Sequence, residues 1–455
     1  MPNENPHKLS TVLPSSSQLE PGGNIEMADS VLLSLPSLTP SLAVEVLPQG
    51  VTFHRIIVQA DGRTHDVVIG PEVPEEHSTQ KYVGTIIGRY ANRVPVGKHT
   101  VERKGIKAEF EAQPNESPRV SLHGGPTGFD LLPWKVLSAE EKPTLFSQAE
   151  IAHLPKSGSG SSFAFFQLES PDRDQGYPGK LLVEALVAVI EPGQQERKYS
   201  ESPGDAVGKE YDLGSIVYVY RAKVDKGVTP INLTNHWGFN LDASLKEGEE
   251  SLSVKDHSLL LKADHIAQRD ADSLCTALVP APTEHVHNGK KIGENSPPSG
   301  YDDFYLFEEK PIPIPRRVEL SSFNDNFDLL GDLLRPSNGP NASRGARTEP
   351  FAELASEKSG IKLVFDTNQT GMMFYTNIGA SPAKGARKKI HGGSGTKDHG
   401  DGYPEWAAAF LEFHEPLHAF LDPAKKDKDD TLLTSDELYN NYVRLDVRFK
   451  EVRRK

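Results

Sequence analysis

The stretch VTPINLTNHWGFNL, residues 228–241, predicts a β-strand that ends in a cluster of polar side chains. Apolar residues open the stretch, Asn235 and His236 follow them, and Trp237 comes next. An imidazole can donate or accept a proton near neutral pH, and an aromatic ring can cover the C–H face of a pyranose. The stretch therefore fits a sugar site in which Trp237 contacts the substrate. It also fits a satisfied core histidine beside a packed tryptophan.

The overall composition narrows the class of protein. The chain has 455 residues, of which 36% are hydrophobic, and it contains 38 Gly and 35 Pro. These values indicate one core diluted by turns and polar insertions. The net charge of −14, without a long basic block, argues against a nucleic-acid partner.

Cysteine usage and hydropathy bear on the compartment. Cys275 is the only cysteine, which excludes an intrachain disulfide and a cysteine-based zinc site and fits a reducing environment. No apolar run approaches the roughly 20 residues that span a bilayer. The first residues lack the basic start and apolar core of a secretory signal. We therefore expect a cytoplasmic protein that does not associate with membranes.

Short apolar runs joined by turns dominate the chain. Residues 1–38, rich in Pro, Ser and Asn, predict a disordered or loosely attached arm. Residues 51–59 and 65–69 flank Asp61-Gly62 and predict a hairpin. Further strands are expected at 163–168, 181–190, 215–224, 258–262, 316–320, 361–365, 407–413 and 442–449.

The strand patterns indicate the fold class. Residues 181–190 are apolar on both faces, as in a buried sheet, whereas residues 442–449 alternate and predict one buried face and one wet face. Helical periodicity is scarce, so the fold class is all-β, a large antiparallel β-sandwich. We expect one domain over residues 39–455, with long loop insertions near 192–212, 337–349 and 384–402.

Two stretches before residue 130 carry side chains that could bind a ligand. In GRYANRV, Arg89, Asn92 and Arg93 could hold sugar hydroxyls, because the guanidinium offers fixed donors and the amide offers both donor and acceptor. A helical turn with surface arginines fits the same residues. His123 precedes two glycines, whose missing side chains let a ligand approach closely, although an incidental histidine at a glycine turn fits as well.

Carboxylates among apolar residues mark two later stretches. Asp302 and Asp303 are adjacent within GYDDFYLF, and at most one of them should face a pocket because consecutive strand residues point to opposite faces. Glu412 lies within an apolar strand, where a carboxylate is either paired or has a raised pKa, which is what a general base needs. A glutamate on the wet face of an edge strand fits the same pattern. Residues 174–179, DQGYPG, predict a tight turn.

These stretches, in this order, resemble motifs of the aldose 1-epimerase family, also called galactose mutarotases. The corresponding motifs are GRxANRI at 88–94, LHGGxxGFD at 122–130, EGYPG at 175–179, TNHxYFNL at 234–241, FDH at 301–303 and LExQ at 411–414. The resemblance runs from about residue 45 to the C-terminus. It implies a large antiparallel β-sandwich with a sugar pocket on its concave face, in the supersandwich arrangement of galactose mutarotases.

The resemblance also implies a reaction and roles. The family interconverts the α and β anomers of a free aldose such as glucose or galactose, without a metal or an organic cofactor. By similarity, Glu412 is the base, His236 is the acid, and His123 donates a hydrogen bond near the ring oxygen or assists the acid. The side chains that orient hydroxyls would be Asn92, Arg93 and Asp302.

Some positions depart from the family pattern. Asp303 stands where a histidine is usual, Met373 where a sugar-binding glutamine often stands, and His414 where the motif ends in glutamine. These changes leave open a catalytically weak sugar-binding or regulatory protein of the same fold. A hexose-6-phosphate mutarotase with Arg89 and Arg93 as a phosphate clamp also stays open.

A glycoside hydrolase that uses Glu412 and Asp302 as its two carboxylates is a further alternative. In every case the expected partner is a small sugar, and the sequence favours a monomer.

Overall fold

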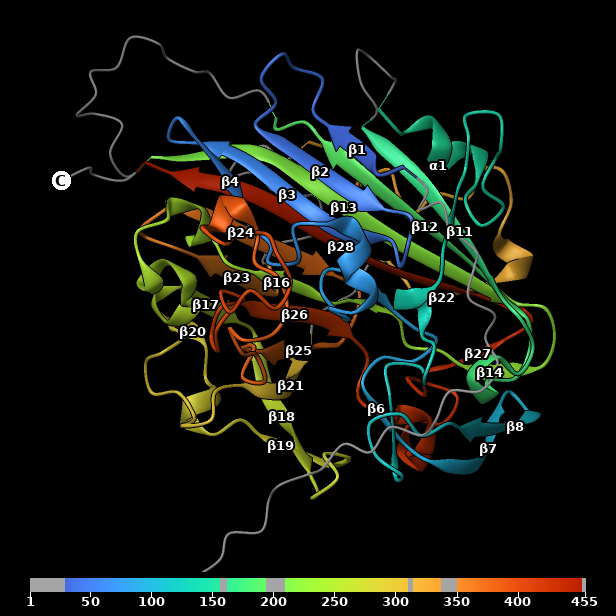
Figure 1. Cartoon of the computed structure of the whole chain (residues 1–455). Coiled ribbons are helices and arrows are strands. Elements are labelled where there is room, and N and C mark those ends of the chain that lie inside the picture. The colour runs from blue at the N-terminus through green and yellow to red at the C-terminus, as the bar shows by residue number, and fades with distance from the viewer. Residues whose placement is uncertain (1–28, 156–161, 194–208, 310–313, 337–349, 452–455) are drawn as a thin grey trace, which may run out of the picture.

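The computed structural model describes residues 29–155, 162–193, 209–309, 314–336 and 350–451. Within these ranges the regular structure is almost entirely β, and α1 (Gln148–Ala152) is the one α-helix (Figure 1). All the named strands pair antiparallel. The all-β antiparallel sandwich expected from the sequence is confirmed.

The largest sheet has ten strands and includes the longest ones. In spatial order they are β10 (Lys135–Val136), β11 (Phe163–Ser170), β12 (Leu181–Ile190), β13 (Glu210–Val224), β28 (Glu437–Lys450), β24 (Ile361–Thr367), β23 (Ala352–Ala355), β17 (Ser258–Leu261) and β20 (Asn288–Lys291), with β22 (Arg317–Glu319) also paired to β28.

Two further sheets complete the framework of the sandwich. One has six strands in the order β16 (Trp237–Phe239), β26 (Ala409–His414), β25 (Gly371–Tyr375), β21 (Asp302–Phe307), β18 (Ala263–Arg269) and β19 (Cys275–Pro280). The other has four strands in the order β1 (Val31–Ser34), β2 (Leu42–Leu47), β3 (Thr52–Ala60) and β4 (Arg63–Asp66). The predicted hairpin is the β3–β4 pair.

Short ladders and 3₁₀ helices connect these sheets. The ladders join β5 (Ile86–Ile87) to β15 (Thr234–Asn235), β6 (Arg93–Pro95) to β9 (Val120–Leu122), β7 (Gly97–Arg103) to β8 (Ile106–Ala112), and β14 (Val228–Pro230) to β27 (Leu432–Thr434). The 3₁₀ helices are η1 (Pro74–Ser78), η2 (Phe129–Leu131), η3 (Asp174–Gly176), η4 (Ala243–Leu245), η5 (Glu249–Leu252), η6 (Val254–Asp256), η7 (Thr283–His285), η8 (Leu320–Ser322), η9 (Lys389–His391), η10 (Ala419–Leu421) and η11 (Pro423–Lys425).

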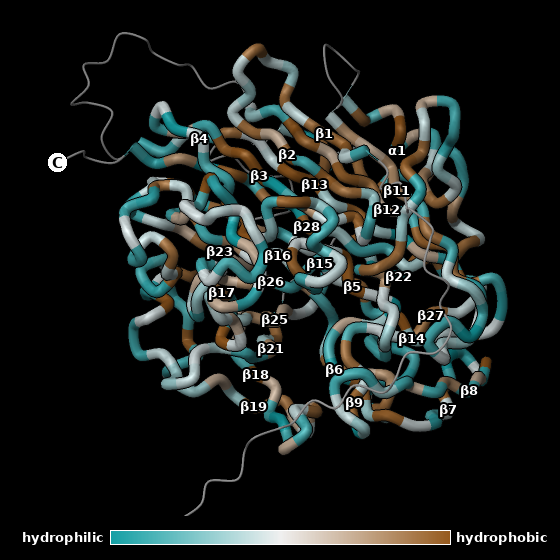
Figure 2. Tube along the Cα trace, in the orientation of Figure 1, coloured by the Kyte–Doolittle hydropathy of each residue, from teal (hydrophilic) through white to brown (hydrophobic). Residues whose placement is uncertain are grey.

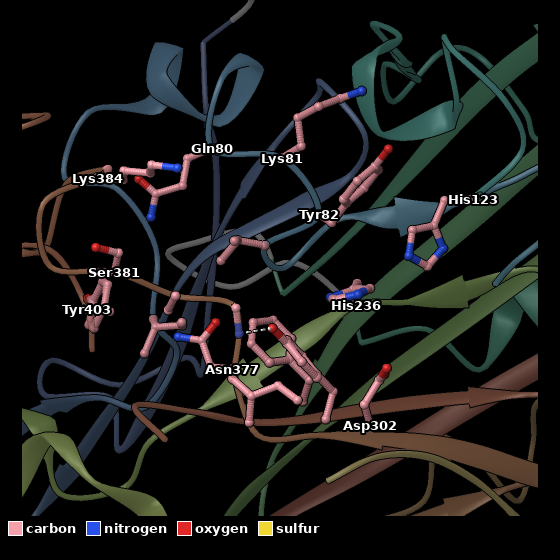
Figure 3. Close-up of a pocket in the computed structure, with 18 of the residues that line it drawn as sticks. Gln80, Lys81, Tyr82, His123, His236, Asp302, Asn377, Ser381, Lys384 and Tyr403 are labelled. Carbon is pink, nitrogen blue, oxygen red and sulfur yellow. Dashed lines mark hydrogen bonds between the residues drawn. The ribbon is translucent and has the colours of Figure 1, made fainter. Parts of the chain in front are cut away.

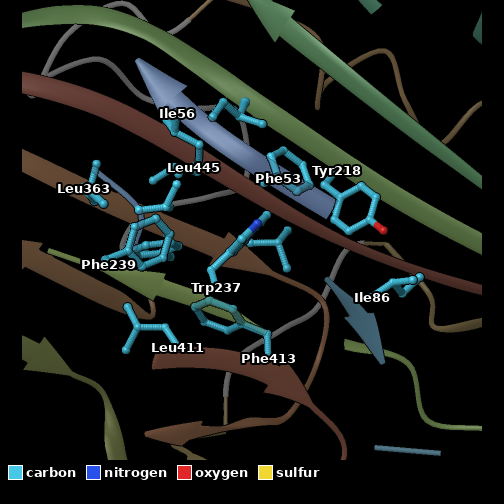
Figure 4. Close-up of a cluster of buried hydrophobic side chains, with 14 of the residues drawn as sticks. Phe53, Ile56, Ile86, Tyr218, Trp237, Phe239, Leu363, Leu411, Phe413 and Leu445 are labelled. Atoms are coloured by element: carbon cyan, nitrogen blue, oxygen red, sulfur yellow. The ribbon is translucent and has the colours of Figure 1, made fainter. Parts of the chain in front are cut away.

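One hydrophobic core lies where the three sheets face one another. Phe53 of β3, Tyr218 of β13 and Leu445 of β28 approach Trp237 of β16 and Leu411 of β26 there (Figure 4). Hydrophobic residues follow the strands, whereas the outlying loops are more hydrophilic (Figure 2). Because side chains alternate along a strand, the residues between the core positions of β26 point away from the core.

The predicted wet face of residues 442–449 is wrong, because a second apolar layer covers it. Arg444 is 3% exposed and Asp446 is 0% exposed. The Arg444 side chain pairs with Asp446 at 2.8 Å and donates to the carbonyl of Arg335 at 2.7 Å. Residues 314–334 and α1 supply the covering cluster, so the charged row of β28 is buried and paired.

Two other expectations change at their boundaries. The predicted loose arm at residues 1–38 ends too late, because β1 pairs with β2 from Val31 onward; residues 1–28 lie outside the described residues. Residues 228–241 form three short strands in three different sheets, β14, β15 and β16, rather than one. Each change of sheet turns the chain, which places His236 between two ladders.

The three predicted insertions differ in what can be said of them. Residues 194–208 and 337–349, which make up most or all of the first two, lie outside the described residues. The third, residues 384–402, packs closely on the sandwich, and its Lys388 is fully buried. Among the described residues, no helix has the length and apolar character needed to cross a membrane.

Candidate active site

A cavity of about 880 Å³ opens on the face of the six-stranded sheet that points away from the core (Figure 3). Phe410 and Glu412 of β26 line it, and they alternate with Leu411 and Phe413, which face the core. The other predicted residues on its wall come from separate elements: Asn92, Arg93, His123, His236 and Asp302. The fold thus brings together five of the six stretches that the sequence singled out, and the turn at residues 174–179 does not line the cavity.

The central contact of this site joins His236 to Glu412. The His236 Nε2 atom lies 3.0 Å from the Glu412 Oε1 atom, and their side chains are 10% and 3% exposed. His236 Nδ1 and Glu412 Oε2 are buried and have no hydrogen-bond partner among the described residues. A buried polar atom without a partner is costly. These two atoms are therefore placed to bond a ligand.

His123 is oriented by the backbone of Asn92. The backbone N–H of Asn92 donates to His123 Nδ1 at 3.2 Å, and the backbone N–H of His123 donates to the Asn92 carbonyl at 3.1 Å. An accepting Nδ1 leaves the ring proton on Nε2. Burial, with the electrostatic effect of His236 and Arg93, holds the pKa of His123 well below its ordinary value of 6.5. His123 is thus a neutral hydrogen-bond donor.

Arg93 lines the cavity, and the carboxylate of Glu116 fixes the position of its guanidinium. Its Nε and Nη2 atoms each donate to Glu116 at 2.8 Å, a bidentate pair that fixes the plane of the guanidinium. Beside it, the amide oxygen of Asn92 accepts from the backbone N–H of Arg93 at 2.9 Å. Neither the Nη1 atom of Arg93 nor the Nδ2 atom of Asn92 has a hydrogen-bond partner among the described residues. These donors are available for hydroxyl groups.

Asp302 and Asp303 point in different directions, as the strand geometry predicted. Asp302 lines the cavity and accepts from Arg269 Nη1 at 3.1 Å. Burial raises the pKa of Asp302, and Arg269 and Arg93 oppose that shift. Asp303 does not line the cavity. Its Oδ1 atom lies 3.6 Å from Arg269 Nη2, and its Oδ2 atom lies 3.9 Å from His285 Nδ1. Only Asp302 can therefore accept a hydrogen bond from a ligand in this cavity.

The expectation that Trp237 contacts the substrate is wrong. Trp237 is 0% exposed and packs edge-on against Phe53 at 5.3 Å between ring centroids, inside the core. It follows His236 directly, so the two side chains leave the strand on opposite faces. A histidine that faces the cavity therefore places the neighbouring indole in the core.

Arg89 is also absent from the cavity, which corrects its expected role in holding hydroxyls or a phosphate. Its guanidinium is buried and donates to the carbonyls of Pro171, Pro178 and Gly179 at 2.9 to 3.1 Å. These contacts fix the turn around η3, which the sequence predicted as a turn. Arg89 therefore supports the fold, whereas Arg93 is the arginine that lines the cavity.

Sequence reasoning missed the aromatic residues that line the cavity. The ring centroid of Tyr82 lies 4.8 Å from that of His123 and 6.3 Å from that of His236. Tyr375 and Phe410 lie opposite each other on β25 and β26, with ring centroids 5.5 Å apart. A regular alternation on β26 would have marked Phe410, but no local pattern singles out Tyr82.

The same cluster offers three atoms of metal-ligand type. One atom each from His123, His236 and Glu412 lies within 4.8 Å of the others. However, His123 Nδ1 already accepts an amide hydrogen, and Nε2 carries the ring proton, so neither nitrogen has a lone pair to offer. The donor set suits proton transfer better than metal binding.

A comparison with known families agrees with this geometry. The family described as aldose 1-epimerase matches residues 37–198 and 211–445. The chain belongs to the aldose 1-epimerase family. It is therefore an isomerase.

Curated relatives of this epimerase extend over most of the chain. It is 28% identical to human galactose mutarotase over 341 residues, 74% of each chain. It is 30% identical to the mouse galactose mutarotase over 341 residues, again 74% of each chain.

Solved structures agree on the fold. An aldose epimerase homologue from C. elegans superposes with a TM-score of 0.62 at 18% identity, covering 93% of this chain and 99% of that chain. A galactose 1-epimerase from Lactobacillus acidophilus superposes with a TM-score of 0.57 at 18% identity, with the same coverage.

Proposed function

We propose that this epimerase interconverts the α and β anomers of a free aldohexose, glucose or galactose, between Glu412 and His236. The observation that carries the proposal is the 3.0 Å contact of a buried carboxylate with a buried imidazole in a cavity of this size. Each of the two groups keeps one buried atom without a hydrogen-bond partner among the described residues. An acid and a base placed side by side are what anomerisation needs.

The reaction can be written with its protons balanced. Glu412 takes the proton from the C1 hydroxyl, the C1–ring oxygen bond breaks, and His236, carrying a proton, delivers it to the ring oxygen. The open-chain aldehyde then rotates about C1–C2. The ring oxygen attacks the other face of C1, His236 recovers its proton, and Glu412 returns its proton to the C1 oxygen. Each positioned acid or base contributes about 10²–10⁴-fold.

The surrounding side chains would hold the sugar while the ring opens. His123 donates through Nε2 near the ring oxygen, and the donors of Asn92 and Arg93 meet hydroxyl groups. Asp302 accepts from a hydroxyl on the opposite side of the cavity. Donors and acceptors on several sides keep the open chain in place until it recloses.

Polarimetry tests the proposal. Freshly dissolved α-D-glucose and α-D-galactose are followed with the wild type, with Glu412→Gln and with Glu405→Gln. The last variant removes a negative charge from an exposed residue of the segment that leads into β26. Faster relaxation with the wild type and Glu405→Gln, and the spontaneous rate with Glu412→Gln, support the proposal. Equal rates for the wild type and Glu412→Gln would rule out this base.

The cytoplasmic location and the monomeric state belong to the same proposal. The single cysteine supports a reducing compartment. Cell fractionation tests the location, and light scattering of the purified chain tests the oligomeric state.

A further inference from the structure

Asp302 lines the cavity (Figure 3), but the arginine that holds its carboxylate does not belong to the cavity lining. Arg269 ends β18 and Asp302 begins β21, and these strands are neighbours in the six-stranded sheet (Figure 1). Arg269 Nη1 donates to Asp302 Oδ2 at 3.1 Å, and the two side chains are 19% and 31% exposed. A charge-assisted hydrogen bond is strong and directional. Arg269 therefore sets the orientation in which the cavity receives the Asp302 carboxylate.

Asp303 gives Arg269 a second carboxylate. Asp303 Oδ1 lies 3.6 Å from Arg269 Nη2, and Asp303 Oδ2 accepts from the backbone N–H of Asp302 at 3.2 Å. The planar guanidinium thus faces two adjacent carboxylates with its two terminal nitrogens, and it keeps its charge at any physiological pH. One of these carboxylates lines the cavity and the other does not. Asp303 therefore restrains Arg269 without contact with a ligand.

A β-bulge lies beside Arg269 in the β18–β19 hairpin. Gln268 pairs with Ala277. The next residue, Arg269, pairs with Cys275, so Thr276 is the extra residue of the bulge. The Thr276 hydroxyl donates to the Gln268 carbonyl at 3.1 Å, which fixes the bulge. Bulges bend a strand and re-aim the side chains beside them, so the local backbone favours the direction that Arg269 takes.

The turn after Arg269 has its own hydrogen bonds. Asp270 Oδ1 accepts from the backbone N–H groups of Asp272 and Leu274 at 2.9 and 3.0 Å. Asp272 also pairs with Arg119 at 2.6 Å, and the Arg119 side chain is 74% exposed. An exposed ion pair of this kind contributes little to stability. The backbone of Arg269 is therefore fixed by the hairpin itself.

Arg269 also favours the charged form of Asp302. Burial raises the pKa of Asp302, and the charge of Arg269 is the largest opposing influence, followed by that of Arg93. Arg93 donates two hydrogen bonds to Glu116. Among the described residues, Arg269 is the only cation in hydrogen-bond or ion-pair contact with Asp302. A carboxylate accepts a hydrogen bond from a hydroxyl more strongly than a neutral acid does.

We propose that Arg269 is a positioning residue of this epimerase: restrained by Asp303, it keeps the Asp302 carboxylate directed into the cavity as the acceptor for a sugar hydroxyl. The inference rests on the proposed function, which assigns Asp302 to a hydroxyl. A hydroxyl that does not react bonds Asp302 equally before and during ring opening. Loss of such uniform binding raises KM and leaves kcat unchanged, so Arg269 should affect binding rather than the chemical step.

Polarimetry at several concentrations of α-D-glucose and α-D-galactose tests the proposal with Arg269→Gln, Asp302→Asn and the double variant. Arg269→Gln is expected to raise KM about tenfold, the contribution of one charge-assisted hydrogen bond, with kcat within about threefold. In the Asp302→Asn background the same substitution should change KM by less than about twofold, because Arg269 acts through Asp302. Arg119→Gln, which removes an exposed ion pair from the turn after Arg269, is the matched control and should leave KM within about twofold.

Asp303→Asn is the second variant, and it carries the test if Arg269→Gln does not fold. It is expected to raise KM about two- to fourfold, the usual contribution of a partly exposed ion pair, and to have no further effect in the Asp302→Asn background.

Four results would overturn the positioning role. They are an unchanged KM in both Arg269→Gln and Asp303→Asn, a fall in kcat without a rise in KM, full multiplication of the losses in the double variant, and an equal rise of KM in Arg119→Gln. No acceleration of either sugar by the wild type instead overturns the proposed function.

Discussion

Two buried polar clusters border the same cavity, and they satisfy their hydrogen bonds differently. In the catalytic cluster, His236 Nδ1 and Glu412 Oε2 have no partner among the described residues. In the second cluster, around Lys388 and His391, Lys388 Nζ has three oxygen partners, and both ring nitrogens of His391 are bonded. Burial costs free energy in both clusters, but only the second has its hydrogen bonds satisfied within the protein.

This difference in hydrogen bonding distinguishes the cluster that can act on a ligand from the cluster that supports the fold. Buried polar groups are nearly always paired inside a folded protein, so unpaired ones at a cavity indicate the place where a ligand completes the network. A fully paired buried ion indicates a fixed wall. In this enzyme the strands and short ladders of the sandwich carry the incomplete cluster, and a long loop carries much of the complete one.

Removing both members of the catalytic pair gives the largest expected effect. Glu412→Gln and His236→Asn each lower kcat/KM by about 10²–10⁴-fold. The double variant is expected to lose little more than the worse single variant, because two groups that act as one unit are not additive. Polarimetry on glucose measures this loss, and His399→Asn, which changes an exposed histidine, is the control.

Full additivity of the two losses would show that the pair does not act as a unit. Near-wild-type activity in either single variant would remove that residue from the chemistry.

The Lys388 cluster predicts a stability effect without a catalytic one. Lys388→Met leaves the Asp66 carboxylate buried without its cation, which costs about 3–5 kcal/mol of unfolding free energy. Lys389→Met, the exposed neighbour, should change it by less than about 0.5 kcal/mol. Denaturant unfolding measures both. Under conditions where Lys388→Met is folded, glucose turnover should stay near wild type; a loss as deep as that of Glu412→Gln would contradict the separation of the two regions.

Asp130 gives a smaller, pH-dependent effect near the catalytic cluster. Burial raises the pKa of its carboxyl from 3.8 to about 6, against the opposing charges of Lys81 and His236. The folded state then binds the proton more tightly, so the free energy of unfolding falls as pH rises from about 4 to about 6, by about 3 kcal/mol in total. Asp130→Asn should therefore be more stable than wild type at pH 7.5, and the gain should shrink toward pH 4.5. Urea unfolding at both pH values checks this, and a gain independent of pH would refute it.

Metal removal gives the smallest expected effect. Because neither nitrogen of His123 can act as a ligand in its present hydrogen bonding, treatment with a chelator should leave glucose turnover unchanged within error. Full loss of turnover with chelator, restored by a divalent cation, would contradict the assignment of His123 as a neutral donor.

The sequence predicted a buried polar residue only where the signal for it is local, and not where its contacts come from residues far away in the sequence. Glu412 and His236 stand in local motifs, and the strand around each is visible in its own pattern. Lys388 could not be found, because its partners His54, Asp66 and Val68 lie more than 300 residues earlier and its own loop is rich in Gly and Lys. The same holds for the buried charges of β28, which look solvated until residues 314–334 are seen to cover them.

The prediction that Trp237 contacts the substrate was wrong for a different reason. The motif correctly marked the neighbouring histidine, but proximity in sequence was taken as a shared face, and strand alternation sends adjacent side chains apart. The aromatic side chains that line the cavity are instead those of Tyr82, Tyr375 and Phe410, from three separate segments.

The most direct test of the account is a crystal structure of the Glu412→Gln variant with bound galactose. The account predicts the C1 hydroxyl within hydrogen-bond distance of the side chain at position 412 and the ring oxygen close to His236. A sugar bound with C1 directed toward Ser381, away from position 412 and His236, would contradict the catalytic pair.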